Sequence, residues 1–552
     1  MHKFFTRHNL QSDSGGNTDS YIAHSGNTAL ISGAILFQTV ALSYILAAVT
    51  MLFGGVISCW MFPAAFLVSV AVSICFSPGC YRRVKALAVP AILIAVSVAV
   101  ASFFEDNSYD GNWYHQEGVA AMLGGWNPYH MADSMPLSVW AIHYANGIET
   151  SAAVLSSFTG HIESGKAMNL LMLFATGLIV YSALRRSTDC KKSAIIAVFA
   201  VCNPVCITQM LTFYIDYAKY LYLLIALSAL CRIYTCGRQK INWIMLSEVI
   251  IFAIATKFNA FFEMGVIISV ALVAFWVQRK HDIAVKLLIV GALSAIVGTL
   301  VLGYHPYITN WISKGHPLYP LLGTGNIDIM TSNTPDVLQG VDRFSAFFKS
   351  LFSFKLASYD TRVGGFGPFM PLMFVASVIV FGYYRRSISK WVWLIVACVI
   401  ASCFFFEQSW WTRYTCQLWL FPTAALYELL TQPHRNRFNR VLCYILLAAG
   451  AVNTASCITV TFVTTLNNTY KRHYIYRNFN GATIRAARVD LQTLRHLSEH
   501  DINVEEVSAD SLDLDKCVDF YPGFTTLQLT EEDLDNIESI SLSWYKRFSA
   551  WK

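Results

Sequence analysis

Charged residues are scarce in this chain. Of its 552 residues only 13% are Asp, Glu, Lys or Arg, whereas 55% are hydrophobic. Soluble domains typically carry about 25% charged residues, so a chain of this length cannot cover a water-exposed surface with so few. The composition therefore excludes a cytosolic enzyme, a disordered scaffold, a collagen-like protein and a coiled coil. It indicates a protein embedded in a lipid bilayer.

The sequence also lacks the short motifs that bind nucleotides or a catalytic zinc ion. It contains no P-loop, no glycine-rich dinucleotide fingerprint and no HExxH motif. Functions driven by ATP or by hydride transfer are therefore unsupported. His305 and His316 do not have the spacing of metal ligands, and we expect no zinc site.

Thirteen apolar runs approach the length of about 20 residues that a helix needs to cross a bilayer. They cover residues 29–52, 56–76, 86–104, 167–184, 193–213, 218–231, 241–256, 260–277, 285–303, 367–384, 391–406, 414–431 and 441–465. Several of these runs are short. We therefore expect an all-α polytopic membrane protein with about 13 transmembrane helices, within a range of 11 to 14.

Lys and Arg are distributed unevenly between the short loops. One alternating set of loops holds nineteen of them, and the other holds only Lys219, Lys257 and Arg413. Cytoplasmic loops carry the excess of positive charge in membrane proteins. The pattern predicts a cytoplasmic N-terminus and an extracytoplasmic C-terminus.

This orientation places every long loop outside the cytoplasm. We expect a flexible cytoplasmic leader over 1–27 and a transmembrane domain over 28–466, followed by a small extracytoplasmic α/β unit over 467–552. Within the transmembrane domain the two large external loops span 105–166 and 304–366. Loops of this length usually carry function, so the working surface is expected to face outward.

The first external loop opens with a group of acids. Glu105, Asp106 and Asp110 follow the third apolar run, among several aromatic residues and close to His115. Aromatic residues at a membrane interface are ordinary anchors, but anchoring does not explain three carboxylates. Capping of the short helix that follows would account for Asp110 alone. The group is where we expect a catalytic base.

This loop, with the turn Gly124-Gly125-Trp126-Asn127-Pro128-Tyr129 that follows it, resembles the GT-C superfamily of membrane glycosyltransferases. That superfamily includes protein O-mannosyltransferases, the lipid A aminoarabinose transferase and oligosaccharyltransferases. Residues 306–320, 362–368 and 410–414 resemble further recurring segments of its bacterial members, with His316 where Asn is usual. The resemblance covers roughly residues 86–422, although two spans precede the acidic loop where the family commonly has one.

The resemblance implies a GT-C-like fold with interfacial helices in the external loops and an inverting glycosyl transfer. Such an enzyme moves a hexosyl or pentosyl unit from a polyprenyl-phosphate carrier to an acceptor outside the membrane. For this chain it implies a bacterial inner membrane and an acceptor that is a cell-surface polysaccharide, an O-antigen or a lipid. We expect a monomer whose other partners are membrane lipids, and no nucleic acid.

Inversion requires a carboxylate that accepts the proton of the acceptor, and cations that stabilise the departing phosphate. We expect Asp110 to be the base, with Asp106 as the second choice. The expected ligands of the donor phosphate are Lys257, Arg362 and Arg413. Candidates for acceptor binding or a second site are Asp216, Glu105, His115 and Tyr114.

Each of these assignments has an ordinary structural alternative. Lys257 and Arg413 are also typical of cations that snorkel at helix ends, and Arg362 is typical of a solvated loop charge. Asp216 is close enough in sequence to Lys219 for an ion pair, and an isolated His115 is usually a hydrogen-bonded side chain. We expect no obligatory cofactor; a divalent cation, Mg²⁺ or Mn²⁺, beside the acids stays open.

Two other functions share the same compartment. A transporter or flippase of lipid-linked oligosaccharides would place charge deep in its spans, and Glu248 lies within the seventh apolar run. An oligosaccharide polymerase or ligase usually keeps one dominant external loop late in the chain. The early acidic loop therefore favours transfer over polymerisation.

Overall fold

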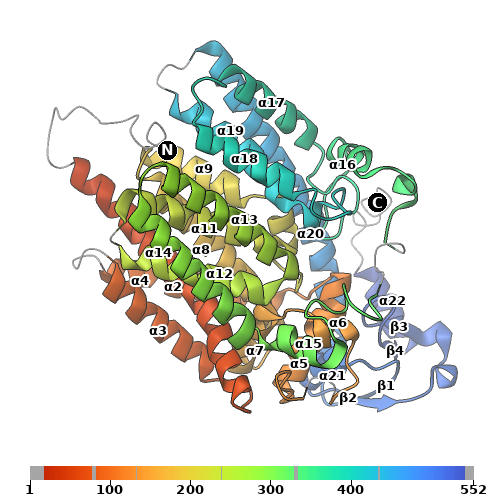
Figure 1. The fold of residues 1–552 in the computed structure, drawn as a ribbon. Coiled ribbons are helices and arrows are strands. Elements are labelled where there is room, and N and C mark those ends of the chain that lie inside the picture. Colours follow the sequence, from red (N-terminus) through yellow and green to blue (C-terminus); the bar gives the residue numbers. More distant parts are fainter. Residues whose placement is uncertain are drawn as a thin grey trace.

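The computed structural model describes residues 18–77, 83–131, 134–237, 239–327, 333–432 and 436–540, without the side chains of residues 18–25 and 83–85. Over these ranges the chain forms a bundle of mostly long helices, followed by a small unit of strands and short helices (Figure 1). This architecture agrees with the expected helical membrane protein that ends in a small sheet.

Seven helical segments in the described part of the chain are long and apolar enough to cross a membrane. They belong to α2 (Thr18–Leu52), α4 (Arg83–Phe103), η2 (Ile162–Lys166) with α8 (Ala167–Leu184), α11 (Asp216–Cys236), α13 (Phe258–Val277), α14 (His281–Ile296) with η3 (Val297–Val301), and α20 (Arg437–Asn478). The other apolar runs form the shorter helices α3 (Met61–Phe76), α9 (Cys190–Val201), α12 (Lys240–Thr256), α17 (Met370–Tyr383), α18 (Lys390–Ser402) and α19 (Leu420–Thr431). Each of the thirteen runs therefore contains a helix, and seven of these helices have the length of a full span.

Several helix boundaries differ from those expected. The run over 193–213 is broken because the Asn203 side chain accepts a hydrogen bond from the Val205 amide and Pro204 begins a new helix, α10 (Pro204–Gln209). The expected domain boundary at 467 lies inside α20, which continues to Asn478. Residues 1–17 of the expected leader lie outside the described residues, whereas 18–27 belong to α2.

The helices α11 and α12 form the centre of the bundle. Both are buried along most of their length, and α11 also packs against α8, which in turn contacts α2 (Figure 1). A second group, formed by α17, α19 and α20, packs beside them. The loops that join these helices bring together side chains from distant parts of the sequence.

The C-terminal unit contains a four-stranded sheet in the order β2-β1-β4-β3. Its strands are β1 (Thr483–Ala487), β2 (Asn503–Glu506), β3 (Cys517–Asp519) and β4 (Thr526–Gln528). The strands β1 and β2 are parallel and are joined through α21 (Leu491–Ser498), whereas β4 pairs antiparallel with both of its neighbours. The helix α22 (Glu531–Ser539) follows, with Thr530 and Asp533 forming a capping box.

The two large loops that we expect to be external also contain short helices. The first holds η1 (Gly111–His115), α5 (Gln116–Leu123), α6 (Val139–His143) and α7 (Gly147–Thr159); the second holds η4 (Tyr304–Ile308), α15 (Thr309–Lys314), η5 (Asp336–Leu338) and α16 (Arg343–Leu351). The helices η6 (Thr412–Tyr414) and η7 (Cys416–Trp419) connect α18 to α19, and η8 (Ala509–Ser511) and η9 (Leu514–Lys516) belong to the C-terminal unit. In Figure 1 that unit lies beside α5 and α6 at one end of the bundle, and α21 packs against α5.

Candidate functional site

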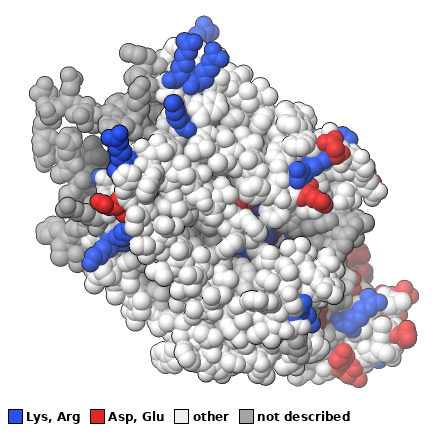
Figure 2. Space-filling view, in the orientation of Figure 1, with Lys and Arg blue, Asp and Glu red and all other residues white. Residues whose placement is uncertain are grey.

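Five ionisable side chains from five separate segments meet at this end of the bundle. Asp110 precedes η1, Asp216 is the first residue of α11, Lys257 separates α12 from α13, Asp360 lies in the loop after α16, and Arg413 belongs to η6. We call these five residues the acid–cation cluster. Figure 2 shows a hollow near the middle of the displayed face in which blue and red atoms lie below a mostly white surface.

Arg413 lies at the centre of this cluster. Its Nη1 atom is 2.7 Å from Oδ2 of Asp110 and 3.6 Å from Oδ2 of Asp216. Its Nε atom is 3.5 Å from Oδ1 of Asp360. One guanidinium therefore faces three carboxylates that are far apart in the sequence.

Lys257 supplies the second cation, and the backbone conformation at this residue determines where its side chain lies. Its residue is extended, at φ −158° and ψ 134°, so α12 ends there and α13 begins in a new direction. This break directs the Lys257 ammonium group to Oδ1 of Asp216. Asp216 itself occupies the first turn of α11, where the helix dipole stabilises a negative charge.

Aromatic rings surround the guanidinium. The Arg413 Cζ atom lies 4.2 Å from the ring centre of Trp411 and 5.3 Å from those of Tyr214 and Tyr414. Such rings attract a cation through their negative faces and exclude water from it. The Tyr214 hydroxyl is buried and has no hydrogen-bond partner among the described residues.

Exposure separates the members of the cluster. The side chains of Asp110, Lys257 and Asp360 are 16%, 22% and 22% exposed, whereas that of Asp216 is only 2% exposed. The first three are therefore accessible from solvent. Asp216 lies behind them and pairs with both cations.

Asp360 was missed from the sequence. It lies two residues before Arg362, and its Oδ1 atom accepts a hydrogen bond of 3.1 Å from the Trp411 indole. Burial raises the pKa of Asp360 to about 6, and the repulsion of Asp110 adds to this effect while Arg413 opposes it. Its position beside the Gly-rich turn was the available sequence signal.

The other expected cation and the neighbouring aromatic residue border the cluster. Arg362 donates to the Asn333 carbonyl oxygen at 3.1 Å, and its Cζ atom lies 5.3 Å from the Trp411 ring centre. The Tyr114 hydroxyl lies 3.5 Å from Oδ2 of Asp110, and burial raises the pKa of Tyr114. Tyr114 therefore contacts a member of the cluster directly, whereas Arg362 and Arg413 both contact the Trp411 ring.

His115 and Lys219 point elsewhere. The Nδ1 atom of His115 lies 2.7 Å from Oε1 of Glu149, in a buried contact between η1 and α7. Lys219, which sequence proximity had offered as a partner for Asp216, instead pairs with Glu263 at 3.0 Å and donates to the Tyr414 carbonyl oxygen. That carbonyl follows Arg413 directly, so Lys219 helps to fix η6.

Asp106 and Glu105 face away from Asp110. The two carboxylate oxygens of Asp106 each accept a 2.7 Å hydrogen bond from a backbone amide, one from Ser108 and one from Phe213. Asp106 thereby ties the acidic loop to the segment that leads into Asp216. Glu105 joins a second buried cluster with Glu163 and His496.

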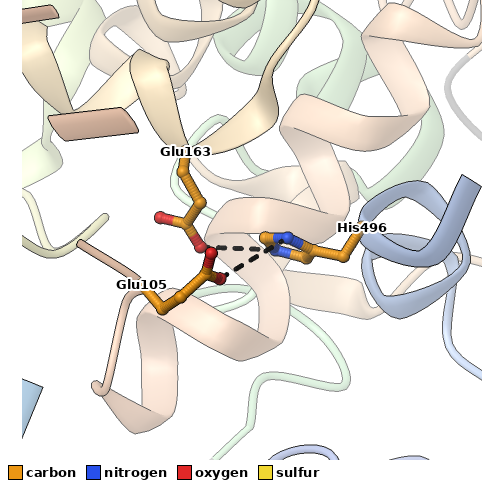
Figure 3. Close-up of side chains that lie close together, drawn as sticks. All are labelled: Glu105, Glu163 and His496. Atoms are coloured by element: carbon orange, nitrogen blue, oxygen red, sulfur yellow. Dashed lines mark ion pairs between the residues drawn. The ribbon is translucent and has the colours of Figure 1, made fainter. Parts of the chain in front are cut away.

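Figure 3 shows the His496 ring facing both carboxylates. Its Nδ1 atom is 3.7 Å from Glu105 and its Nε2 atom is 3.3 Å from Glu163. The three donor groups are near enough to one another for a metal ion. However, Arg472 lies 3.1 Å from Glu105, and Lys166 bonds Glu163. Because both carboxylates are already paired with cations, these residues do not fit a divalent ion.

The same test applies to the acid–cation cluster. Carboxylates are suitable ligands for Mg²⁺ or Mn²⁺. Here, however, Asp110, Asp216 and Asp360 all lie against Arg413 or Lys257. A divalent ion would have to displace these cations, so this arrangement does not fit one either.

Comparison with known proteins does not assign the chain to a family. A scan against protein-family models finds no match, and no curated protein matches the chain.

Proposed function

We propose that the protein is an inverting glycosyltransferase of GT-C-like fold that moves a sugar from a polyprenyl-phosphate carrier to an extracytoplasmic glycan or lipid. In this proposal about thirteen helices cross a bacterial inner membrane, with the N-terminus in the cytoplasm and the C-terminus outside. The observation that supports it best is the acid–cation cluster, because it pairs a part-exposed carboxylate, Asp110, with Arg413 and links Arg413 through Asp216 to the second cation, Lys257.

The reaction follows from these positions. Asp110 accepts the proton of the acceptor hydroxyl as its oxygen forms a bond to the anomeric carbon. The bond between that carbon and the phosphate oxygen breaks, and its electron pair leaves on the phosphate. Lys257, Arg413 and Arg362 stabilise the developing charge, and protonation of Asp110 weakens its pair with Arg413, which is then free to turn toward the phosphate.

An apolar cavity supports a lipid-linked donor. It has a volume of about 180 Å³ and lies between α8, α9, α11, α18 and α19, with a lining that includes Leu224, Leu227, Ile395 and Val396. A separate, smaller cavity of about 10 Å³ lies between α11, α13 and α18 and is lined by Leu223 among others. Leu224 is eight residues beyond Asp216, or about 12 Å along the helix. An isoprenoid chain that extends from the cluster along α11 would meet this lining.

The test is mass spectrometry of surface glycans and lipids from cells that carry the wild-type protein, Asp110→Asn, Asp510→Asn or no protein. Asp510 is an exposed acid in the C-terminal unit and provides the matched control. We expect a sugar-sized mass increment with the wild type and the control, and a loss of about 100-fold or more in Asp110→Asn. Full activity of a properly inserted Asp110→Asn protein would rule out Asp110 as the base.

The same experiment separates transfer from transport. Identical spectra from all four strains would favour a transporter or flippase of lipid-linked oligosaccharides. Glu248 was the residue that kept transport open. Its carboxylate accepts hydrogen bonds of 3.1 and 3.0 Å from Gln38, and so joins α12 to α2.

A further inference from the structure

A row of aromatic rings connects the C-terminal unit to Asp110. The Phe524 ring centre lies 5.4 Å from that of Tyr109, which lies 5.8 Å from that of Trp113. Tyr521 lies 5.3 Å from Phe524 on the same turn, between β3 and β4. We call these four residues the aromatic seam.

Three rings of the seam are open to solvent, whereas Tyr521 is buried beneath them, and the seam adjoins the cluster. Tyr109 is 50% exposed, although it packs against two other rings, and Trp113 and Phe524 are partly exposed. Tyr109 immediately precedes Asp110. From Trp113 the row continues to Tyr114, 5.7 Å between ring centres, and the Tyr114 hydroxyl is the one that lies 3.5 Å from Asp110.

The two halves of the seam are held in register. The Tyr521 hydroxyl donates to the Asn107 carbonyl oxygen at 3.4 Å. The Gln492 side chain on α21 donates to the Asn112 carbonyl oxygen at 2.7 Å. Both bonds join the C-terminal unit to the loop that carries Asp110, so the rings from the two parts of the chain form one fixed surface.

The charge of the C-terminal unit restricts what this surface can bind. Residues 479–540 contain fourteen Asp and Glu against four Lys and Arg. This excess of negative charge repels phosphate-rich and carboxylate-rich ligands. The part-exposed rings of Tyr109, Trp113 and Phe524, with the Tyr109 hydroxyl, instead suit an uncharged pyranose, whose C–H faces carry the partial positive charge that the ring face attracts and whose hydroxyls bind the phenol.

We propose that the aromatic seam is a binding subsite for a neutral saccharide chain, which places the hydroxyl at its end beside Asp110. The identification of this chain as the acceptor rests on the proposed function, whereas the binding itself does not. In this arrangement the C-terminal unit selects the acceptor and the helical bundle holds the lipid-linked donor.

The experiment uses the full-length protein in a detergent without a sugar headgroup, applied to an array of neutral and uronic-acid-containing pyranose oligosaccharides. We expect the wild type to bind neutral oligosaccharides, and Tyr109→Leu and Phe524→Leu each to weaken binding by roughly three- to tenfold. Phe524→Tyr keeps the ring and should bind as the wild type does. Phe354→Leu, which alters another exposed ring at 76% exposure, is the matched control.

Asp110→Asn separates this inference from the proposed function. The variant should keep saccharide binding even where it abolishes transfer. If no neutral oligosaccharide binds, or if Tyr109→Leu and Phe524→Leu bind as well as the wild type, the inference is wrong while the transferase proposal stands. If the seam binds saccharides but no transfer is found, the transferase proposal fails instead.

Discussion

At the scale of the residue, burial and charge balance together explain the behaviour of Asp360. Burial raises the pKa of Asp360 to about 6, and the repulsion of Asp110 adds to this effect. The acid–cation cluster holds three carboxylates against two cations, so full ionisation would leave an uncompensated negative charge in a largely buried site. The nearest cation to Asp360 is Arg413, at 3.5 Å.

We predict that stability depends on pH through Asp360. Its pKa in the folded protein is about 6, above its ordinary value of 3.8, so the folded state holds the proton more tightly. The resulting stabilisation is complete below pH 4 and is lost as the pH rises through 6, with an upper limit of about 3 kcal/mol. Melting temperatures of wild type and Asp360→Asn should therefore diverge between pH 4 and 6. Parallel curves would show that Asp360 titrates normally.

Because charged residues are scarce in this sequence, part of the acid–cation cluster could be predicted from it. Lys257 and Arg413 attracted notice because the external short loops hold so few cations, and both lie in the cluster with Asp110 and Asp216. Asp360 was not predictable in this way, because it lies in a long loop where an acid is unremarkable. The structure shows that these residues lie close together, whereas their catalytic roles stay predictions.

At the scale of the element, the second buried cluster attaches the C-terminal unit to the bundle. Arg472 of α20 contacts Glu105 at 3.1 Å and Glu163 at 3.7 Å. His496 of α21 faces the same carboxylates, and burial lowers its pKa to about 3, so it remains neutral. Arg472 therefore supplies much of the positive charge that permits these acids to be buried.

We predict that Arg472→Met loosens this attachment. Loss of the guanidinium leaves Glu105 and Glu163 short of positive charge in a buried site, at a cost of about 3 to 5 kcal/mol. Amide hydrogen exchange in β1 and β4 should become faster than in the wild type. Arg477→Met changes an exposed Arg in the last turn of the same helix and should leave exchange unchanged. Unaltered exchange in Arg472→Met would show that apolar contacts alone hold the unit.

Helix positions were more predictable than helix ends. Apolar runs located a helix in all thirteen cases because desolvated backbone must bond internally. The break at Asn203-Pro204 was missed, since the flanking residues stay apolar on both sides. The end of α20 was also missed, because polar residues after 465 can continue a helix beyond the apolar interior of the membrane.

At the scale of the whole molecule, orientation in the membrane is the main expectation to test. The uneven distribution of Lys and Arg predicts that Cys517 of the C-terminal unit lies outside and that Cys190, at the start of α9, faces the cytoplasm. Both are free thiols. Because they are expected on opposite sides, they can serve as internal reporters of orientation.

We predict that a membrane-impermeant maleimide labels the Cys517 peptide in intact cells and the Cys190 peptide only after permeabilisation. Peptide mapping by mass spectrometry distinguishes the two sites without mutation. Permeabilised cells show that both thiols react when they are accessible. Labelling of Cys190 alone in intact cells would invert the proposed topology and would place the acid–cation cluster in the cytoplasm.

The length of α20 fixes how far the protein reaches. Its 42 residues extend about 63 Å, twice the roughly 30 Å hydrocarbon thickness, so about half of the helix stands clear of the apolar layer. Because α20 is one continuous helix, its length determines how far the C-terminal unit lies from the bilayer. One inserted residue would rotate that unit by about 100° around the helix axis, whereas seven would nearly restore its azimuth and raise it by about 10 Å. The distance of the C-terminal unit from the bilayer is thus set by the number of residues in α20.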